Sequence, residues 1–138
     1  MLKNEQINSL HIAYEKHDNC KILENIAIIY GFFGTDIFRI LATTRALSIM
    51  LKSDPKPQDI VFVEAQRNKD NAAFAWLENY GVKYIFKEYT EESEGLLLKT
   101  ALWNIGAAST NAEKLCFIDS DIVFCNQDWL ESVYSAFD

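Results

Sequence analysis

The sequence predicts an α/β fold, with a Rossmann-like, mostly parallel sheet flanked by helices. Short apolar runs alternate along the chain with segments of helical length. The runs are apolar at almost every position, which is typical of strands that are buried on both faces of a sheet. Because strand, helix and strand in succession form right-handed βαβ units, this alternation indicates that the strands pair in parallel.

The first expected elements are a leader helix within residues 1–20 and a core strand at residues 21–30. The leader mixes apolar and charged positions, which permits a helix. The strand (KILENIAIIY) ends in a continuous apolar run, and residues 31–34 (GFFG) indicate a turn after it. A Thr-Asp pair then offers N-cap oxygens to a helix at residues 37–52, which residues 54–57 (DPKP) bring to an end.

A second strand is expected at residues 59–65 (DIVFVEA), and a second helix at residues 68–80. Asn68 offers a capping side chain at the start of this helix, and Gly81 suits the position just past its last turn. A third strand follows at residues 82–87.

The last expected elements are a helix at residues 96–109, a strand at residues 115–119 and a closing helix at residues 129–137. Apolar residues recur along one face of the first of these helices, as in a helix that packs on a sheet. Residues 21–138 are therefore expected to form a single α/β domain.

Length and composition agree with one domain that has a proper core, because 49% of the 138 residues are hydrophobic. The net charge is −7 and the basic residues are scattered, which disfavours nucleic acid as a partner. The three cysteines lack zinc spacing and favour a reducing compartment. No apolar run approaches the roughly 20 residues that cross a bilayer. We therefore expect a cytoplasmic protein, or one that is peripheral at the inner membrane surface.

The most informative stretch is residues 114–124 (KLCFIDSDIVF), a strand with two aspartates at its carboxyl end. Asp119 and Asp121 flank the small Ser120, so a turn there would direct both carboxylates at one cation. Ligands of open α/β sheets lie outside the carboxyl ends of strands, and carboxylate oxygens suit Mg²⁺ or Mn²⁺. Such a cation would neutralise a diphosphate leaving group. The alternative is a solvated acidic turn that caps the following segment.

Residues near two other strand ends are candidates for nucleotide contacts. Glu64 ends the second strand and is followed by Gln66 and Arg67, and an acid there can accept hydrogen bonds from a base or a ribose. Tyr30 and Phe32 follow the first strand, where their rings can stack on a base. The alternatives are a charge that emerges into water and aromatic residues that belong to the core.

The helix before the acidic strand carries Lys99 and Asn104. The ammonium of Lys99 can meet a phosphate as a point charge. The alternative for Lys99 is the solvated face of an amphipathic helix. His11 and His17 lie in the leader, far from the acids in sequence, and are not proposed as ligands.

In this order, the segments resemble the nucleotide-binding half of GT-A glycosyltransferases, especially the large inverting family whose second strand has the pattern EIIVVDDGS. The matching stretch is residues 59–67 (DIVFVEAQR). Residues 45–50 (RALSIM) resemble that family's first helix. Residues 99–106 (KTALWNIG), followed by residues 113–121 (EKLCFIDSD), are similar to its asparagine-x-glycine helix and DxD strand. The resemblance covers roughly residues 25–138 and depends on order and spacing.

The resemblance implies glycosyl transfer from a nucleoside diphosphate sugar, with UDP-sugar favoured, to an acceptor that the sequence does not identify. Asp119 and Asp121 would bind Mn²⁺ or Mg²⁺ against the diphosphate. The first and fourth strands are neighbours in that fold, so Tyr30 and Asp119 are expected to face one crevice. The expected nucleotide-sugar site comprises Tyr30, Gly31, Phe32, Glu64, Gln66, Arg67, Lys99, Asn104 and Ser120.

The sequence also departs from the family pattern. Glu64 stands where aspartate is usual, Ala65 and Gln66 replace an Asp-Gly pair, and Trp103 stands where an arginine often precedes the asparagine. Family members continue past the DxD strand to supply the acceptor site, a general base and often a histidine for the metal. We therefore expect a domain that is incomplete at its C-terminus, as a fragment, a degenerate protein or one part of an assembly.

Three other functions are open to the same residues. The strongest alternative is a non-catalytic nucleotide-sugar-binding or interaction module. The acidic string also resembles the DxDx(T/V) motif of haloacid dehalogenase-like phosphotransferases, but that superfamily begins with its acidic strand. A receiver-like domain requires acids after the first strand, where residues 31–34 (GFFG) stand instead.

The acidic strand is also expected to leave an apolar edge uncovered, near Phe117 to Phe124. Uncovered apolar edges favour pairing with another chain. We therefore expect a homo-oligomer or a partner chain at this edge.

Overall fold

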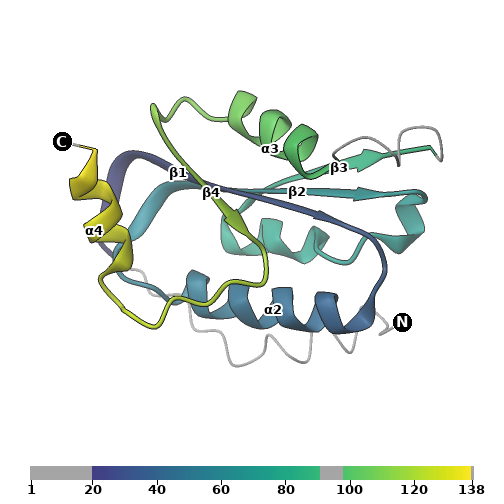
Figure 1. Cartoon of the computed structure of the whole chain (residues 1–138), viewed down its shortest axis with the longest axis horizontal. Coiled ribbons are helices and arrows are strands. Elements are labelled where there is room, and N and C mark those ends of the chain that lie inside the picture. Colours follow the sequence, from purple (N-terminus) through teal and green to yellow (C-terminus); the bar gives the residue numbers. More distant parts are fainter. Residues whose placement is uncertain (1–19, 91–97, 138) are drawn as a thin grey trace.

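The computed structural model describes residues 20–90 and 98–137. The leader helix expected within residues 1–20 lies outside these ranges, apart from Cys20. The described residues form an all-parallel, four-stranded sheet that is flanked by helices (Figure 1). The predicted α/β, Rossmann-like fold class is therefore confirmed.

The strands are β1 (Ile22–Phe33), β2 (Lys56–Gln66), β3 (Lys83–Glu88) and β4 (Lys114–Asp119). Their order in the sheet is β3-β2-β1-β4, so β1 is central and pairs with both β2 and β4. The chain first adds strands on one side of β1 and then returns to its other side. The carboxyl ends of β1 and β4 therefore flank the point where the strand order reverses, which is where open α/β sheets bind ligands.

Helices cover both faces of the sheet (Figure 1). Helix α2 (Ile37–Leu51) lies on one face, and α3 (Leu98–Ala108) lies on the other. Helix α4 (Trp129–Ala136) lies beside the end of the sheet where β1 begins. The carboxyl ends of the strands are thus at the opposite end from α4.

Alternate residues of β1 serve two separate hydrophobic cores. Ile28 and Tyr30 pack on the α2 side of the sheet, whereas Ala27 and Ile29 pack on the α3 side. This division follows from the two-residue period of a strand. It also means that neighbouring residues at the end of β1 face different helices.

The turn after β1 comes later than the sequence suggests. Residues 31–33 belong to β1, and Gly34 ends the strand with a φ of 95°, which only glycine adopts readily. The Asp36 side chain then accepts a hydrogen bond from the Arg39 backbone N–H at 2.9 Å and caps α2, as the sequence predicts.

The prediction of a continuous helix at residues 68–80 is wrong. Two 3₁₀ helices stand there instead, η1 (Lys69–Asn71) and η2 (Ala75–Tyr80). The backbone between them is drawn toward β2, because the N–H groups of Ala73 and Phe74 donate to the buried Glu64 carboxylate. This tertiary contact outweighs the local preference for a continuous helix.

Strand β4 is an outer strand of the described sheet, and exposed apolar residues lie on it and on the segment that follows it. The exposed fractions are 44% for Phe117, 43% for Ile122 and 46% for Val123. This agrees with the expected uncovered edge, whereas the homo-oligomer or partner chain stays a prediction. None of the helices in the described ranges is long and apolar enough to span a bilayer.

Helix α3 packs very closely on the sheet at Gly106. A Cβ atom built there would lie 2.5 Å from Ile29 Cγ2 and 3.3 Å from Val63 Cγ2. These contacts come from β1 and β2, so a side chain at Gly106 would push α3 away from both strands. The position of α3, and of the lysine in its first turn, depends on this close approach.

Gly106→Ala is therefore expected to lower the free energy of unfolding by about 1–3 kcal/mol, through overpacking. A loss of stability would be informative, because alanine forms helices more readily than glycine where packing does not oppose it. Chemical denaturation of both proteins measures the difference. Ala101→Ser adds one atom on the exposed side of the same helix and should change stability by less than about 0.5 kcal/mol. Equal stability of Gly106→Ala and the wild type would contradict the close approach.

Candidate functional site

The acidic end of β4 meets three other elements at one cavity. Asp119 pairs with Gly31 across β4 and β1, and the backbone N–H of Ile122 donates to the carbonyl of Asp119 at 3.2 Å. This hydrogen bond closes the turn through Ser120 and Asp121 that the sequence predicts. The cavity has a volume of about 170 Å³ and is lined by Gly31, Phe33, Arg39, Thr43, Lys99, Asp119, Ser120 and Asp121. Five residues of the expected site thus lie together.

Lys99 and Asp119 form an ion pair across the cavity wall. The side chains are 42% and 48% exposed, respectively, and the Lys99 Nζ also lies 5.0 Å from the centroid of the Trp103 ring. Exposed ion pairs contribute only about 0–1 kcal/mol to stability, because water screens both charges. Lys99 can therefore exchange Asp119 for another anion at little cost in free energy.

Ser120 supports the turn between the two aspartates. Its side chain is buried, and its hydroxyl is hydrogen-bonded to the Thr43 hydroxyl at 3.0 Å. Because Thr43 is itself buried on α2, this bond holds the acidic turn against that helix. The hydrogen bond between Ser120 and Thr43 thereby helps to position Asp119 and Asp121 at the cavity.

Arg39 is a cavity residue that the sequence analysis missed. Its Nη1 donates to the carbonyl of Phe33 at 3.2 Å, and its guanidinium lies over the rings of Phe32 and Phe33, at 5.2 and 5.4 Å from their centroids. These contacts fix the guanidinium at the cavity wall. They use one of its five N–H donors, so most of the fork stays available to an anion. The signal for Arg39 was its place in the first turn of the helix that follows β1.

Tyr30 and Phe32 do not face the cavity, which corrects the expectation that they stack on a base. Both side chains are buried in the core on the α2 side of the sheet. The register pairs Gly31 with Asp119, so Tyr30 points to the opposite face from Asp119. Burial raises the pKa of the Tyr30 hydroxyl well above its usual range. Their proposed place in the crevice is therefore wrong.

Glu64 is also buried, and both of its oxygens are occupied. The carboxylate accepts hydrogen bonds from Ala73 N, Phe74 N, the Tyr84 hydroxyl at 2.7 Å and Gln66 Nε2 at 2.9 Å. Burial, and then the hydrogen bond to Glu64, raises the pKa of the Tyr84 hydroxyl. In this arrangement Glu64 organises the 3₁₀ segment, and it is not available to a nucleoside.

A second cavity, of about 290 Å³, lies on the other side of the β1 end. It is lined by Gly34, Thr35, Gln66, Arg67, Asn71 and Tyr89. Gln66 Nε2 donates to the Gly34 carbonyl at 2.8 Å and so links the ends of β1 and β2. Gln66 and Arg67 of the expected site thus lie here, beside the acidic cavity, whereas Asn104 is exposed on α3 and lines neither cavity.

The acidic pair offers two protein ligands to a cation. Within residues 20–90 and 98–137, no three or more His, Cys, Asp and Glu side chains gather as a metal site. Mg²⁺ is commonly held by one or two carboxylates, with phosphate oxygens and water in its other positions. Asp119 and Asp121 beside an open cavity fit that pattern.

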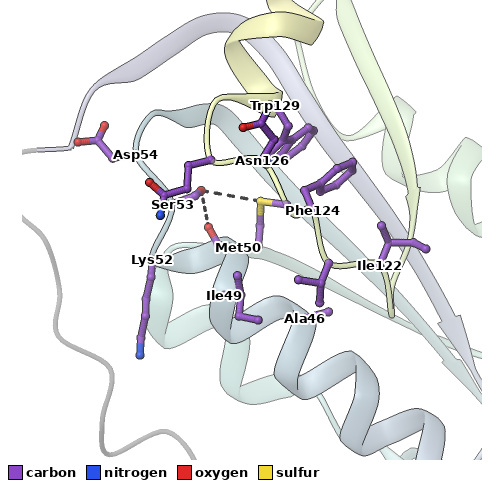
Figure 2. Close-up of a pocket in the computed structure, with 12 residues that line it drawn as sticks. Ala46, Ile49, Met50, Lys52, Ser53, Asp54, Ile122, Phe124, Asn126 and Trp129 are labelled. Carbon is purple, nitrogen blue, oxygen red and sulfur yellow. Dashed lines mark hydrogen bonds between the residues drawn. The ribbon is translucent and has the colours of Figure 1, made fainter.

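A larger cavity, of about 340 Å³, lies between the C-terminal half of α2 and the segment at residues 122–129 (Figure 2). Its wall is largely apolar, with Ala46, Ile49, Met50, Ile122, Phe124 and Trp129 among the residues that line it. Its polar lining residues are Lys52, Ser53, Asp54, Asn126 and Gln127, with one cationic and one anionic side chain among them. The cavity at the carboxyl ends of the strands has two of each, and it therefore suits a phosphate with a cation better.

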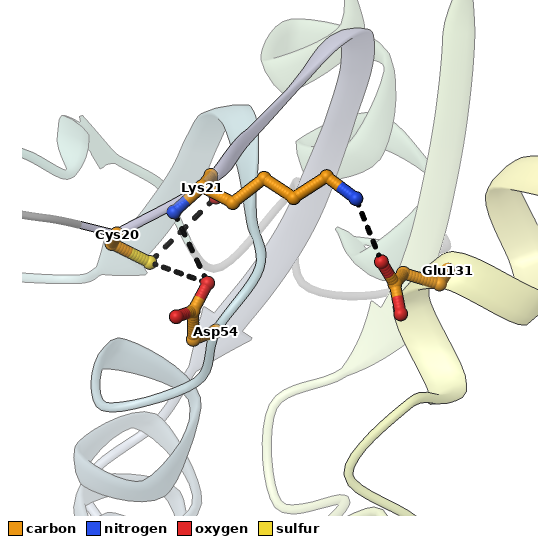
Figure 3. Close-up of polar contacts among 4 residues, drawn as sticks. All are labelled: Cys20, Lys21, Asp54 and Glu131. Atoms are coloured by element: carbon orange, nitrogen blue, oxygen red, sulfur yellow. Dashed lines mark hydrogen bonds and ion pairs between the residues drawn. The ribbon is translucent and has the colours of Figure 1, made fainter.

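The charged groups around the amino edge bind one another (Figure 3). Asp54 accepts hydrogen bonds from the Lys21 backbone N–H at 3.1 Å and from the Cys20 thiol at 3.4 Å. The Lys21 ammonium forms an ion pair with Glu131 at 2.9 Å, which ties α4 to the start of β1. These contacts serve the fold at this edge.

Comparison with known proteins identifies no relative. No family model matches the chain, and neither a curated protein nor a solved structure matches it. Function is therefore inferred from the geometry of the cavities.

Glu64→Gln tests the buried carboxylate. The amide would turn an N–H group toward donors that now meet an oxygen, so the free energy of unfolding should fall by about 3 kcal/mol. Chemical denaturation measures the loss. Glu78→Gln makes the same change at an exposed position of η2 and should be within about 0.5 kcal/mol of the wild type. If both variants were equally stable, Glu64 would not organise this segment.

Proposed function

We propose that this domain binds a nucleoside diphosphate sugar, with UDP-sugar favoured, together with Mn²⁺ or Mg²⁺, for glycosyl transfer. The observation that carries the proposal is one cavity at the reversal of strand order, where two carboxylates lie beside two cationic side chains. Carboxylates alone would repel a diphosphate, and cations alone would not hold a metal. Both kinds of group at one cavity suit a diphosphate that arrives with a divalent cation.

Asp119 and Asp121 would hold the cation, since both are exposed and lie on one turn. The bound cation supplies charge neutralisation to the diphosphate when its bond to the sugar breaks and the acceptor oxygen bonds to the sugar carbon. Ser120 contributes by fixing the turn on α2 through Thr43.

Arg39 and Lys99 would bind the oxygens of the diphosphate. The guanidinium of Arg39 presents a planar set of donors that matches two phosphate oxygens at once, whereas the ammonium of Lys99 acts as a point charge. The neighbouring cavity has the Asn71 amide and the Tyr89 ring in its wall, and these groups suit a nucleoside. The β1 end, at Phe33 and Gly34, borders both cavities, so one ligand would bridge them.

A binding module without turnover is the second candidate. An inverting transferase needs a carboxylate that removes the acceptor proton, in addition to those that hold the metal. Among the described residues that line the acidic cavity, Asp119 and Asp121 are the only carboxylates. Nucleotide binding by the chain alone is common to both candidates, and only an acceptor assay separates them.

Calorimetric titration with UDP and with GDP, each with and without Mn²⁺, tests the proposal. We expect UDP binding that requires Mn²⁺ and that Asp121→Asn weakens by about tenfold or more, because the metal loses a charged ligand. Asp128→Asn is the control, since it removes the same charge from an exposed residue at the start of α4, near the opposite edge of the sheet.

Absence of binding in the wild type, or binding that neither Mn²⁺ nor Asp121→Asn affects, would remove the proposed function. Release of UDP from a UDP-sugar in the presence of an acceptor would favour the transferase over the binding module.

The role of Arg39 gives a separate prediction. Arg39→Gln should weaken UDP binding in the presence of Mn²⁺ by roughly tenfold to hundredfold, because charged hydrogen bonds to phosphate are lost. Uridine binding should not change, since uridine lacks phosphate. Arg45→Gln removes an exposed guanidinium from the same helix and should leave both affinities unchanged. Equal losses for UDP and uridine would indicate a structural role for Arg39.

A further inference from the structure

One of the two carboxylates expected to bind a metal ion is already paired with a cationic side chain of the protein. Lys99 forms an ion pair with Asp119, one of the two expected metal ligands. A divalent cation and an ammonium cannot both approach this carboxylate closely without repelling each other. Binding of a metal to Asp119 therefore requires Lys99 to move.

The two cationic residues of the cavity differ in how firmly they are held. Arg39 is fixed by the Phe33 carbonyl and by two aromatic rings. Lys99 is held by the exposed Asp119 and lies near one face of Trp103. A lysine ammonium on a four-carbon stem moves readily between anions that lie within its reach. Lys99 is thus the cation that can change partners.

We propose that Lys99 occupies Asp119 in the absence of ligand and transfers to the diphosphate when metal and nucleotide bind. This inference rests on the proposed function and adds to it a coupling between the two ligands. The metal displaces Lys99 from Asp119, and the diphosphate provides the displaced ammonium with a new partner. Each ligand thereby removes an obstacle to the other.

The coupling has a defined thermodynamic form. If UDP raises the affinity for Mn²⁺ by some factor, Mn²⁺ raises the affinity for UDP by the same factor. Without Lys99, Asp119 is open before UDP arrives, so part of that factor disappears. The loss of coupling distinguishes exchange of partners from simple support of the fold.

The test measures Mn²⁺ binding with and without UDP, by electron paramagnetic resonance of free Mn²⁺ or by calorimetry. In Lys99→Gln, we expect Mn²⁺ alone to bind about fivefold more tightly than in the wild type, because the competing charge is gone. The factor by which UDP strengthens Mn²⁺ binding should be about fivefold smaller. UDP at saturating Mn²⁺ should bind about tenfold more weakly, since one contact to phosphate is lost.

Two further variants complete the experiment. Lys99→Arg keeps the charge and should keep the coupling, with Mn²⁺ alone bound no more tightly than in the wild type. Lys52→Gln removes one exposed positive charge at the end of α2, near the opposite edge of the sheet, and should leave both affinities and the coupling unchanged. Thermal unfolding of each variant establishes that it is folded.

The outcomes separate this inference from the proposed function. If the wild type binds UDP with Mn²⁺ but Lys99→Gln leaves the coupling unchanged, the exchange is overturned and the proposed function stands. If UDP binds equally well without Mn²⁺ and Lys99→Gln abolishes its binding, Lys99 replaces the metal permanently, which overturns the exchange and the metal site. If the wild type binds neither UDP nor Mn²⁺, the proposed function falls and the inference falls with it.

Discussion

The pairing of β1 with β4, in a register that places Gly31 beside Asp119, is the constraint on which the candidate site depends. It brings the turn after β4 next to the first turns of α2 and α3, which supply Arg39 and Lys99. The same register decides which residues are excluded. Because side chains alternate along a strand, the face that receives Asp119 cannot also receive Tyr30. The site and the core are therefore two consequences of one pairing.

Much of the fold followed from the sequence, because apolar runs of strand length are a direct consequence of burial on both faces. The parallel sheet and helices at the expected places of α2, α3 and α4 were all predictable in this way. The segment at residues 68–80 was not, although Asn68 and Gly81 carried ordinary helix boundary signals. Its conformation depends on the buried Glu64, which lies in β2 and captures two backbone N–H groups. A local pattern does not contain that contact.

The candidate site was predictable in part, and for a similar reason. Asp119 and Asp121 stand out because two acids at the end of an apolar strand are visible along the chain. Whether Glu64 faces a cavity or the interior is decided by donors from Tyr84 and the 3₁₀ segment, which come together only in three dimensions. Arg39 was missed because a single arginine on a helix has no distinguishing pattern. Arg39 becomes a candidate ligand-binding residue because the carbonyl and the ring of Phe33 hold its guanidinium at the cavity.

The chain after the acidic turn is fastened at two points. Ser120 is bonded to Thr43 at one end, and at the other the rings of Phe124 and Trp129 stack with their centroids 3.8 Å apart. Residues 125–127 lie between the two stacked rings along the chain and are exposed. Extra amino acids inserted there would extend outward from a fixed base and leave the aspartates where they are. This span is consequently the natural place to graft a reporter peptide, or an added recognition loop, onto the domain.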